Sequence, residues 1–144
     1  MSLFKISSRL QHALSLLSYL ARDEKGFFSL NEVAQHYRLS QGYLEEISTD
    51  LKKRNLIKSR KGSTGGYCLA RPAERIWLLE IFNAVDAESL AFDCLNASQD
   101  FDCNADEEFA MRKVWAGLNG VILAQLSSIT LKDIAIADNK SLSK

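Results

Sequence analysis

LIKSRKGSTGGYCLA, residues 56–70, is the stretch of sequence that decides the fold. Leu56–Ser59 and Tyr67–Ala70 are short strand-like runs, and the basic, glycine-rich tip between them has the composition of a hairpin turn. Gly65 and Gly66 allow a tight turn and a close approach of the backbone to a binding partner. The stretch therefore predicts a two-stranded wing with basic side chains at its tip.

Two helices joined by a short break are predicted immediately before this hairpin. Ser29 and Glu32 form the S-x-x-E capping box of a helix over about 30–37, and Ser40 caps a second helix over roughly 41–54. Helical spacing turns one apolar set of the two helices inward: Leu30, Val33, Ala34, Tyr37, Leu44, Ile47 and Leu51. Helix, turn, helix and basic hairpin in this order are typical of a winged helix-turn-helix.

The remaining apolar periodicity predicts further helices on both sides of this unit. They cover residues 7–21, about 76–85 with Ile76, Leu79, Phe82 and Val85 inward, 107–128, and a short final helix over 129–134 that Thr130 caps before a frayed tail from Asp138. The fold class that follows is mainly α, a winged helix-turn-helix with a two-stranded wing and a long C-terminal dimerisation helix.

Three regions follow from this pattern. Residues 1–85 form the winged helix-turn-helix region, residues 86–106 a loop, and residues 107–144 the dimerisation helix and tail. The loop has no hydrophobic periodicity and is rich in Asp, Asn and Ser, and loops of this length in a small domain are often functional. We expect it to be a sensing loop.

Charge is distributed unevenly along a chain whose formal net charge is zero. Residues 1–75 hold 13 basic and 7 acidic side chains, a surplus of six positive charges, and the remainder holds 5 basic and 11 acidic ones. Six Lys and Arg residues lie between Lys52 and Lys61 with no acid among them. This asymmetry indicates that the N-terminal half faces a polyanion, although a solvated helix end would give the same basic run.

The second helix of a helix-turn-helix lies in the major groove with its N-terminal residues at base edges. Gln41 suits adenine and Glu45 suits the cytosine amino group, whereas Ser40 and Tyr43 suit phosphate contacts. The same N-terminal part of the helix also includes Gly42 and Glu46. The wing adds four candidate DNA contacts: Arg60, Lys61, Gly65 and Gly66. An alternative of another class is a protein-interaction module whose acidic C-terminal half docks a protein.

Residues 107–128 carry an apolar stripe that is wider than one small domain covers. We expect a second copy of the chain to bury it, with Met111, Trp115, Leu118 and Ile122 in the seam. A two-fold homodimer predicts a palindromic operator in double-stranded DNA.

Composition excludes several classes of protein. With 144 residues the chain has the length of one ordinary domain, and no apolar run is long enough to cross a membrane. Three cysteines and no recognisable signal peptide favour a cytoplasmic location without a disulfide scaffold. No nucleophile–base pair, phosphate loop or zinc-enzyme motif is present, so we do not expect an enzyme.

Residues 43–72, YLEEISTDLKKRNLIKSRKGSTGGYCLARP, resemble the signature of the Rrf2 family, the IscR- and NsrR-like bacterial transcription regulators. The resemblance covers about residues 4–134 and includes Val33-Ala34, the GGY of the wing, and Trp115 followed by Ile129-Thr130-Leu131. It implies a dimeric winged-helix repressor or activator whose long helices cross between subunits. Many members sense iron, nitric oxide or redox state through an iron–sulfur cluster, and others have no cofactor.

The sequence departs from the family pattern at the cluster motif, which usually has three cysteines. Cys94 and Cys103 fall in the loop, but Phe109 stands at the third cysteine position and Arg112 where a ligating His often lies. In some members the first helix of the opposite subunit supplies a ligand, and His12 is the best soft-metal donor there. The resemblance thus implies a cluster held by Cys94, Cys103 and His12, with no cofactor, a disulfide or zinc as the alternatives.

Minor candidates have structural explanations. Cys68 on the return strand of the wing is expected to be a small packing residue, and Trp77 to belong to the core or an interface. Lys61 stands where the family usually has an Arg, and His12 where it usually has an aromatic side chain.

Overall fold

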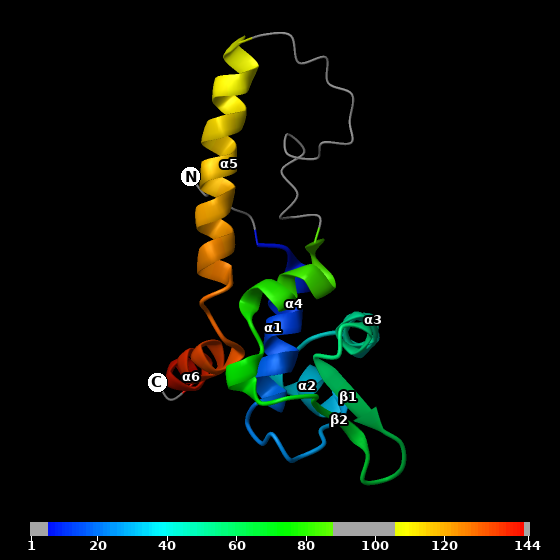
Figure 1. Ribbon diagram of the computed structural model, residues 1–144. Coiled ribbons are helices and arrows are strands. Elements are labelled where there is room, and N and C mark those ends of the chain that lie inside the picture. Colours follow the sequence, from blue (N-terminus) through cyan, green and yellow to red (C-terminus); the bar gives the residue numbers. More distant parts are fainter. Residues whose placement is uncertain (1–5, 88–105, 143–144) are drawn as a thin grey trace.

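The computed structural model describes residues 6–87 and 106–142, and for residues 106–112, 115 and 138–142 it describes the backbone alone. The elements in chain order are α1 (Ser8–Leu20), α2 (Leu30–Tyr37), α3 (Gln41–Lys53), β1 (Ile57–Arg60), β2 (Gly66–Leu69), the 3-10 helix η1 (Ala73–Arg75), α4 (Leu78–Val85), α5 (Asp106–Leu126) and α6 (Leu131–Leu142). Within these ranges the fold is mainly helical with one two-stranded antiparallel sheet, which confirms the predicted class (Figure 1).

Helix α1 is the centre of the packed body, because it contacts α2, α3, α4 and α6. Its buried side is continuous with that of α3, and Leu17, Leu44 and Ile47 are fully buried in one apolar cluster. This cluster fixes the orientation of α3 against α1, and therefore which side of α3 faces outward.

Local capping explains where the helix-turn-helix begins and breaks. The Ser29 hydroxyl accepts from the Glu32 amide at 3.2 Å, and the Glu32 carboxylate accepts from the Ser29 amide at 2.6 Å, so the predicted capping box is confirmed. Arg38 ends α2 in the left-handed conformation, with φ 55°. Ser40 then caps α3 by accepting from the Tyr43 amide at 3.4 Å.

The wing contains one more pairing than the hairpin alone. Strands β1 and β2 pair in antiparallel register, from Ile57 opposite Leu69 to Arg60 opposite Gly66. Phe28 forms an additional bridge with Tyr67, through backbone hydrogen bonds of 2.9 and 2.8 Å. The segment before α2 therefore lies along β2 and ties the wing to the body.

Three predicted features near the C-terminal half were wrong in detail. Helix α4 begins at Leu78 rather than near residue 76, because Ile76 is extended and follows the unpredicted 3-10 helix η1. Ile81 is its fully buried side chain, whereas Leu79 is half-buried. The last helix does not stop near residue 134 but runs to Leu142, through residues predicted as a frayed tail.

The start of α6 is as predicted. The Thr130 hydroxyl accepts from the Asp133 amide at 3.3 Å, and the Asp133 carboxylate accepts from the Thr130 amide at 2.9 Å. Leu131 is fully buried, and α6 packs on α1 and η1. This packing stabilises a helix whose polar C-terminal sequence gave no sign of it.

Helix α5 rises from the body as a single rod of 21 residues that contacts α4 (Figure 1). Three of its apolar side chains are largely exposed, Val114 at 56%, Leu118 at 48% and Val121 at 62%. None of the described helices is long and apolar enough to span a bilayer.

Candidate nucleic-acid interface

The N-terminal turn of α3 presents the side chains predicted to contact bases. Gln41, Gly42 and Glu45 are exposed, and the Gln41 amide donates to the Glu45 carboxylate at 3.1 Å. The two predicted base-reading residues are therefore bonded to each other in the free chain. The Ser40 hydroxyl is used as the helix cap, so a phosphate contact by Ser40 would compete with that bond.

Tyr43 is half-buried between α3 and α1. Its ring meets the ring of His12 edge to face, with centroids 5.2 Å apart, and the guanidinium carbon of Arg9 lies 6.0 Å from its centroid. These contacts fix the direction of Tyr43 at the start of α3, beside Arg9 of α1.

Two of the three acids on α3 are paired with a cation from another helix. Arg9 of α1 forms an ion pair and hydrogen bond with Asp50, and its other terminal nitrogen lies 3.8 Å from a Glu46 carboxylate oxygen. The hydrogen bond from Arg9 holds the pKa of Asp50 below its usual value, and Lys53 at 3.3 Å acts in the same direction. Glu45 is bonded to Gln41 instead.

The tip of the wing is stiffened by Arg60. Its guanidinium carbon lies 3.9 Å from the centroid of the Phe27 ring, and the same group donates to the Thr64 carbonyl oxygen at 2.8 Å. A guanidinium stacked in this way can still donate its remaining N–H groups to a binding partner. The stacking and the hydrogen bond restrict the movement of the side chain. Lys61 is exposed next to it.

The two wing glycines are explained by contacts inside the chain. A Cβ atom at Gly65 would lie 2.1 Å from the carbonyl oxygen of Arg60, and one at Gly66 would lie 2.5 Å from that of Phe28. Gly66 also has φ +135°, which L side chains rarely adopt. Both glycines are therefore required by the wing itself, whether or not they approach DNA.

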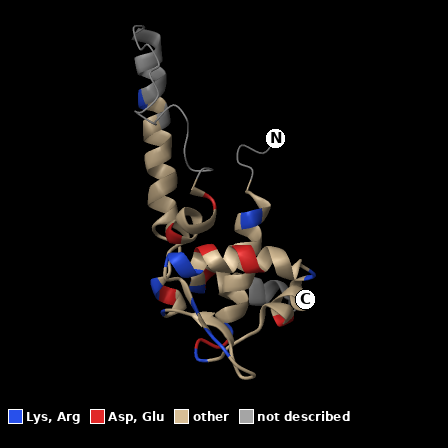
Figure 2. Cartoon of the chain, turned by 90° about the vertical axis from the view of Figure 1, so that its right-hand side faces the viewer, with Lys and Arg blue, Asp and Glu red and all other residues tan. Residues whose placement is uncertain are grey.

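Two lysines of the basic run between residues 52 and 61 make contacts within the chain, and one of them, Lys53, pairs with Asp50 at 3.3 Å. Lys52 donates to the Ser59 hydroxyl at 2.9 Å and so connects α3 to β1. Among the described residues, Arg54, Lys58 and Lys61 are exposed and have no ion-pair partner. Figure 2 shows acidic and basic segments side by side on this face of the body, rather than one uniform basic patch.

The predicted metal donors are only partly within the described chain. Cys94 and Cys103 lie outside the described residues. His12 is half-buried, and its Nδ1 atom is buried without a hydrogen-bond partner. Within the described ranges no three His, Cys, Asp or Glu side chains are grouped to hold a metal, and Cys68 is 2% exposed, as expected for a packing residue.

Only two of the four side chains predicted for the dimer seam are among the described residues. The side chains of Met111 and Trp115 lie outside the described residues, Leu118 is exposed, and Ile122 is half-buried. Trp77, expected in the core or an interface, is 41% exposed at the start of α4.

Two residues at this face were not found from the sequence. Phe27 stacks under Arg60, and Arg9 neutralises acids on α3. An aromatic pair after Gly26 was a visible signal for the Phe27-Phe28 segment. The pairing of Arg9 had no local signal, because it depends on how α1 crosses α3.

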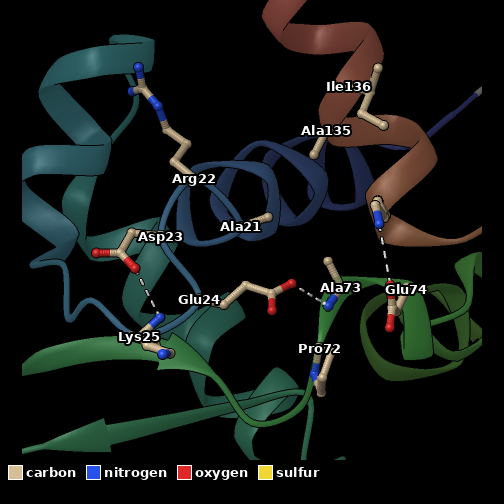
Figure 3. Close-up of a pocket in the computed structure, with 11 residues that line it drawn as sticks. Ala21, Arg22, Asp23, Glu24, Lys25, Pro72, Ala73, Glu74, Ala135 and Ile136 are labelled. Atoms are coloured by element: carbon tan, nitrogen blue, oxygen red, sulfur yellow. Dashed lines mark hydrogen bonds and ion pairs between the residues drawn. The ribbon is translucent and has the colours of Figure 1, made fainter.

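A pocket of about 660 Å³ lies away from this face, between the α1–α2 turn, residues 72–74 and α6 (Figure 3). Several of its polar groups are already used inside the chain. Glu24 accepts from the Ala73 amide at 2.8 Å, and Lys132 pairs with Glu74 at 3.3 Å. These contacts hold α6 and the α1–α2 turn on the segment that follows the wing.

A helix-turn-helix followed by a two-stranded wing defines a winged-helix DNA-binding protein. A model of the Rrf2 family, described as iron-dependent transcriptional regulator, matches residues 6–137. The chain belongs to the Rrf2 family of transcriptional regulators.

Individual relatives agree with this assignment. The chain is 30% identical to the HTH-type transcriptional regulator CymR of Bacillus subtilis over 132 aligned residues. The alignment covers 91% of this chain and 89% of the relative. The solved structure of CymR, the global cysteine regulator of B. subtilis, superposes with a TM-score of 0.75 at 29% identity, covering 94% and 98% of the two chains. The structure of T. potens IscR gives a TM-score of 0.73 at 29% identity, covering 96% and 90%. Since these relatives are transcriptional regulators, the expectation that the chain is not an enzyme is confirmed.

Proposed function

We propose that the chain is a homodimeric, cytoplasmic regulator that binds a palindromic operator, with α3 in the major groove and the wing along the backbone. The observation that carries the proposal is the outward face of α3 beside a stiffened wing, with Arg54, Lys58 and Lys61 exposed and unpaired among the described residues. In this proposal residues 1–85 bind DNA, residues 86–106 form the loop that senses redox state, iron or nitric oxide, and residues 107–144 form the dimer contact and the tail.

Base reading would require the Gln41–Glu45 hydrogen bond to open or to be shared. Gln41 would then bond adenine, and Glu45 would accept from the cytosine amino group. Ser40 and Tyr43 would meet phosphates at the start of α3, beside Gly42, and Arg60 and Lys61 would meet them from the wing. The close packing of Gly65 and Gly66 would keep the wing thin enough to lie on the backbone.

A salt titration against duplex DNA tests this interface. Affinity should fall with a log–log slope of about −0.9 for each phosphate neutralised. Lys61→Ala should weaken binding to all sequences alike and reduce the slope by about one unit, whereas Glu45→Ala should relax base preference by about 1–3 kcal/mol at one position. A flat salt response without DNA affinity would favour the protein-interaction module instead.

The homodimer is supported by the unpartnered apolar side chains of α5. Val114, Leu118 and Val121 are 56%, 48% and 62% exposed in the single chain, which is unfavourable for a contiguous apolar stripe. A second copy of α5 would cover them, and Met111, Trp115, Leu118 and Ile122 remain the predicted seam.

For the sensor, we propose that Cys94, Cys103 and His12 hold an iron–sulfur cluster, completed across the dimer. The structural support is His12 Nδ1, a buried nitrogen without a partner on the first helix. Iron–sulfur clusters usually take four protein ligands, so two thiolates and an imidazole would need a further donor from the second subunit. The cluster would supply a group whose state changes with iron, nitric oxide or redox conditions.

The visible spectrum and iron content of anaerobically purified protein test the cluster. Cys94→Ala and Cys103→Ala should each abolish colour and change DNA affinity, whereas Cys68→Ala should do neither, because Cys68 is buried in the wing. Protein that remains colourless and free of iron after anaerobic reconstitution would contradict the proposal.

A second candidate is a regulator without a cofactor. The occurrence of Phe109 at the family's third cysteine position favours it. Salt-dependent DNA binding by colourless, iron-free protein would support this candidate, and the two cysteines would then be idle or would form a reversible disulfide.

A further inference from the structure

Arg9 lies where α1 crosses α3, and its charged group is shared among side chains of α3. It pairs with Asp50, approaches Glu46 at 3.8 Å, and lies beside the ring of Tyr43. No other cation of α1 reaches these acids in the described chain. Arg9 is partly shielded, with its side chain 31% exposed.

The position of these acids makes their charge important. Glu46 and Asp50 are one turn apart on the helix proposed to enter the major groove, where phosphates line both sides. An unpaired carboxylate there would repel the phosphates and oppose binding. Lys53 compensates Asp50 from the same helix at 3.3 Å, but Arg9 is the cation that contacts both acids.

We propose that Arg9 is a positioning residue for DNA binding, which acts through α3 by neutralising Glu46 and Asp50, whose charges would otherwise repel the phosphates. This inference rests on the proposed DNA-binding function. Arg9 acts through α3 and does not itself need to contact DNA.

A series of variants in which neutral amides replace the charged side chains tests the inference. The variants are Arg9→Gln, the double variant Glu46→Gln/Asp50→Asn, and the triple variant that combines them. Kd is measured with a fluorescent mixed-sequence duplex long enough for two half-sites one helical turn apart. Arg9→Gln should weaken binding about tenfold, which corresponds to about 1.4 kcal/mol, and the triple variant should return to within about twofold of the wild type.

Two further measurements separate positioning from other roles. Arg9→Lys keeps the charge and should retain most of the affinity, and Arg54→Gln serves as a control for the loss of one exposed cation. If Arg9 contacted a phosphate directly, the triple variant would not recover and the salt slope would fall by about 0.9. Thermal unfolding of each variant identifies any loss of affinity that arises from loss of folding.

The outcomes distinguish this inference from the function on which it rests. A wild-type chain without salt-dependent affinity for DNA would overturn both. Wild-type binding with unchanged affinity in Arg9→Gln, or a loss that neutral Glu46 and Asp50 positions do not restore, would overturn the role of Arg9 alone.

Discussion

The packed body and the projecting helix α5 use apolar side chains in opposite ways. In the body, Leu17 and Ile47 are fully buried within one chain, whereas in α5 Leu118 and Val121 are 48% and 62% exposed. Burying a large aliphatic side chain contributes about 1.5–3 kcal/mol, so the body gains its stability from its own chain. The apolar face of α5 can make such a contribution only against a partner.

The largest effect should come from the core of the body. Leu17→Ala removes a fully buried side chain from α1 and should lower the free energy of unfolding by about 3–5 kcal/mol. Leu118→Ala should change it by less than about 1 kcal/mol when measured at a concentration that dissociates dimers. Urea denaturation measures both, and similar costs for the two variants would contradict the distinction between the regions.

The next effect concerns assembly. Leu118→Asp would place an unpaired charge in the proposed seam of α5, so sedimentation should show monomers or aggregates. Lys113→Asp, at an exposed position on the opposite side of the same helix, serves as the control and should remain dimeric. A clean dimer of Leu118→Asp would place the seam elsewhere on the chain.

Among surface features of the body, the wing should lose the most stability on substitution of a single residue. Gly66→Ala would bring a methyl group 2.5 Å from the Phe28 carbonyl oxygen at φ +135°, and we expect a loss of about 1–3 kcal/mol together with weaker DNA binding. Gly42→Ala meets only the Ser40 hydroxyl, at 3.9 Å, and should be neutral or slightly stabilising. Thermal unfolding of the two variants side by side measures the difference.

The smallest expected effect is electrostatic and depends on pH. Because Arg9 lowers the pKa of Asp50 in the folded chain, the pair stabilises the fold above the unfolded pKa of Asp, about 3.9, and this contribution is lost as pH falls through the lower folded value. Both side chains are partly exposed, so we expect less than about 1 kcal/mol. Urea unfolding at pH 7 and pH 3 should show a smaller acid sensitivity in Asp50→Asn than in the wild type, with Glu45→Gln as the control.

Features coded by neighbouring residues were predictable, and features that join distant segments were not. The Ser29–Glu32 box, the Ser40 cap and the hairpin depend on residues within a few positions, so their sequence patterns were sufficient. The Arg9–Asp50 pair and the Phe28–Tyr67 bridge join segments about 40 residues apart, and no local pattern specifies them. Helix α6 was underestimated because its polar end depends on packing against α1 and η1.

The Phe28–Tyr67 bridge also has a consequence for the order in which the molecule assembles. Strands β1 and β2 can pair by closing a short turn, but the bridge must bring together residues 39 positions apart, which costs more chain entropy. We therefore expect the hairpin to form before it docks on the segment preceding α2. The amide hydrogens of Phe28 and Tyr67, each bonded to the other residue's carbonyl oxygen, should show the same free energy of opening in hydrogen exchange, which is the free energy of undocking the wing from the body.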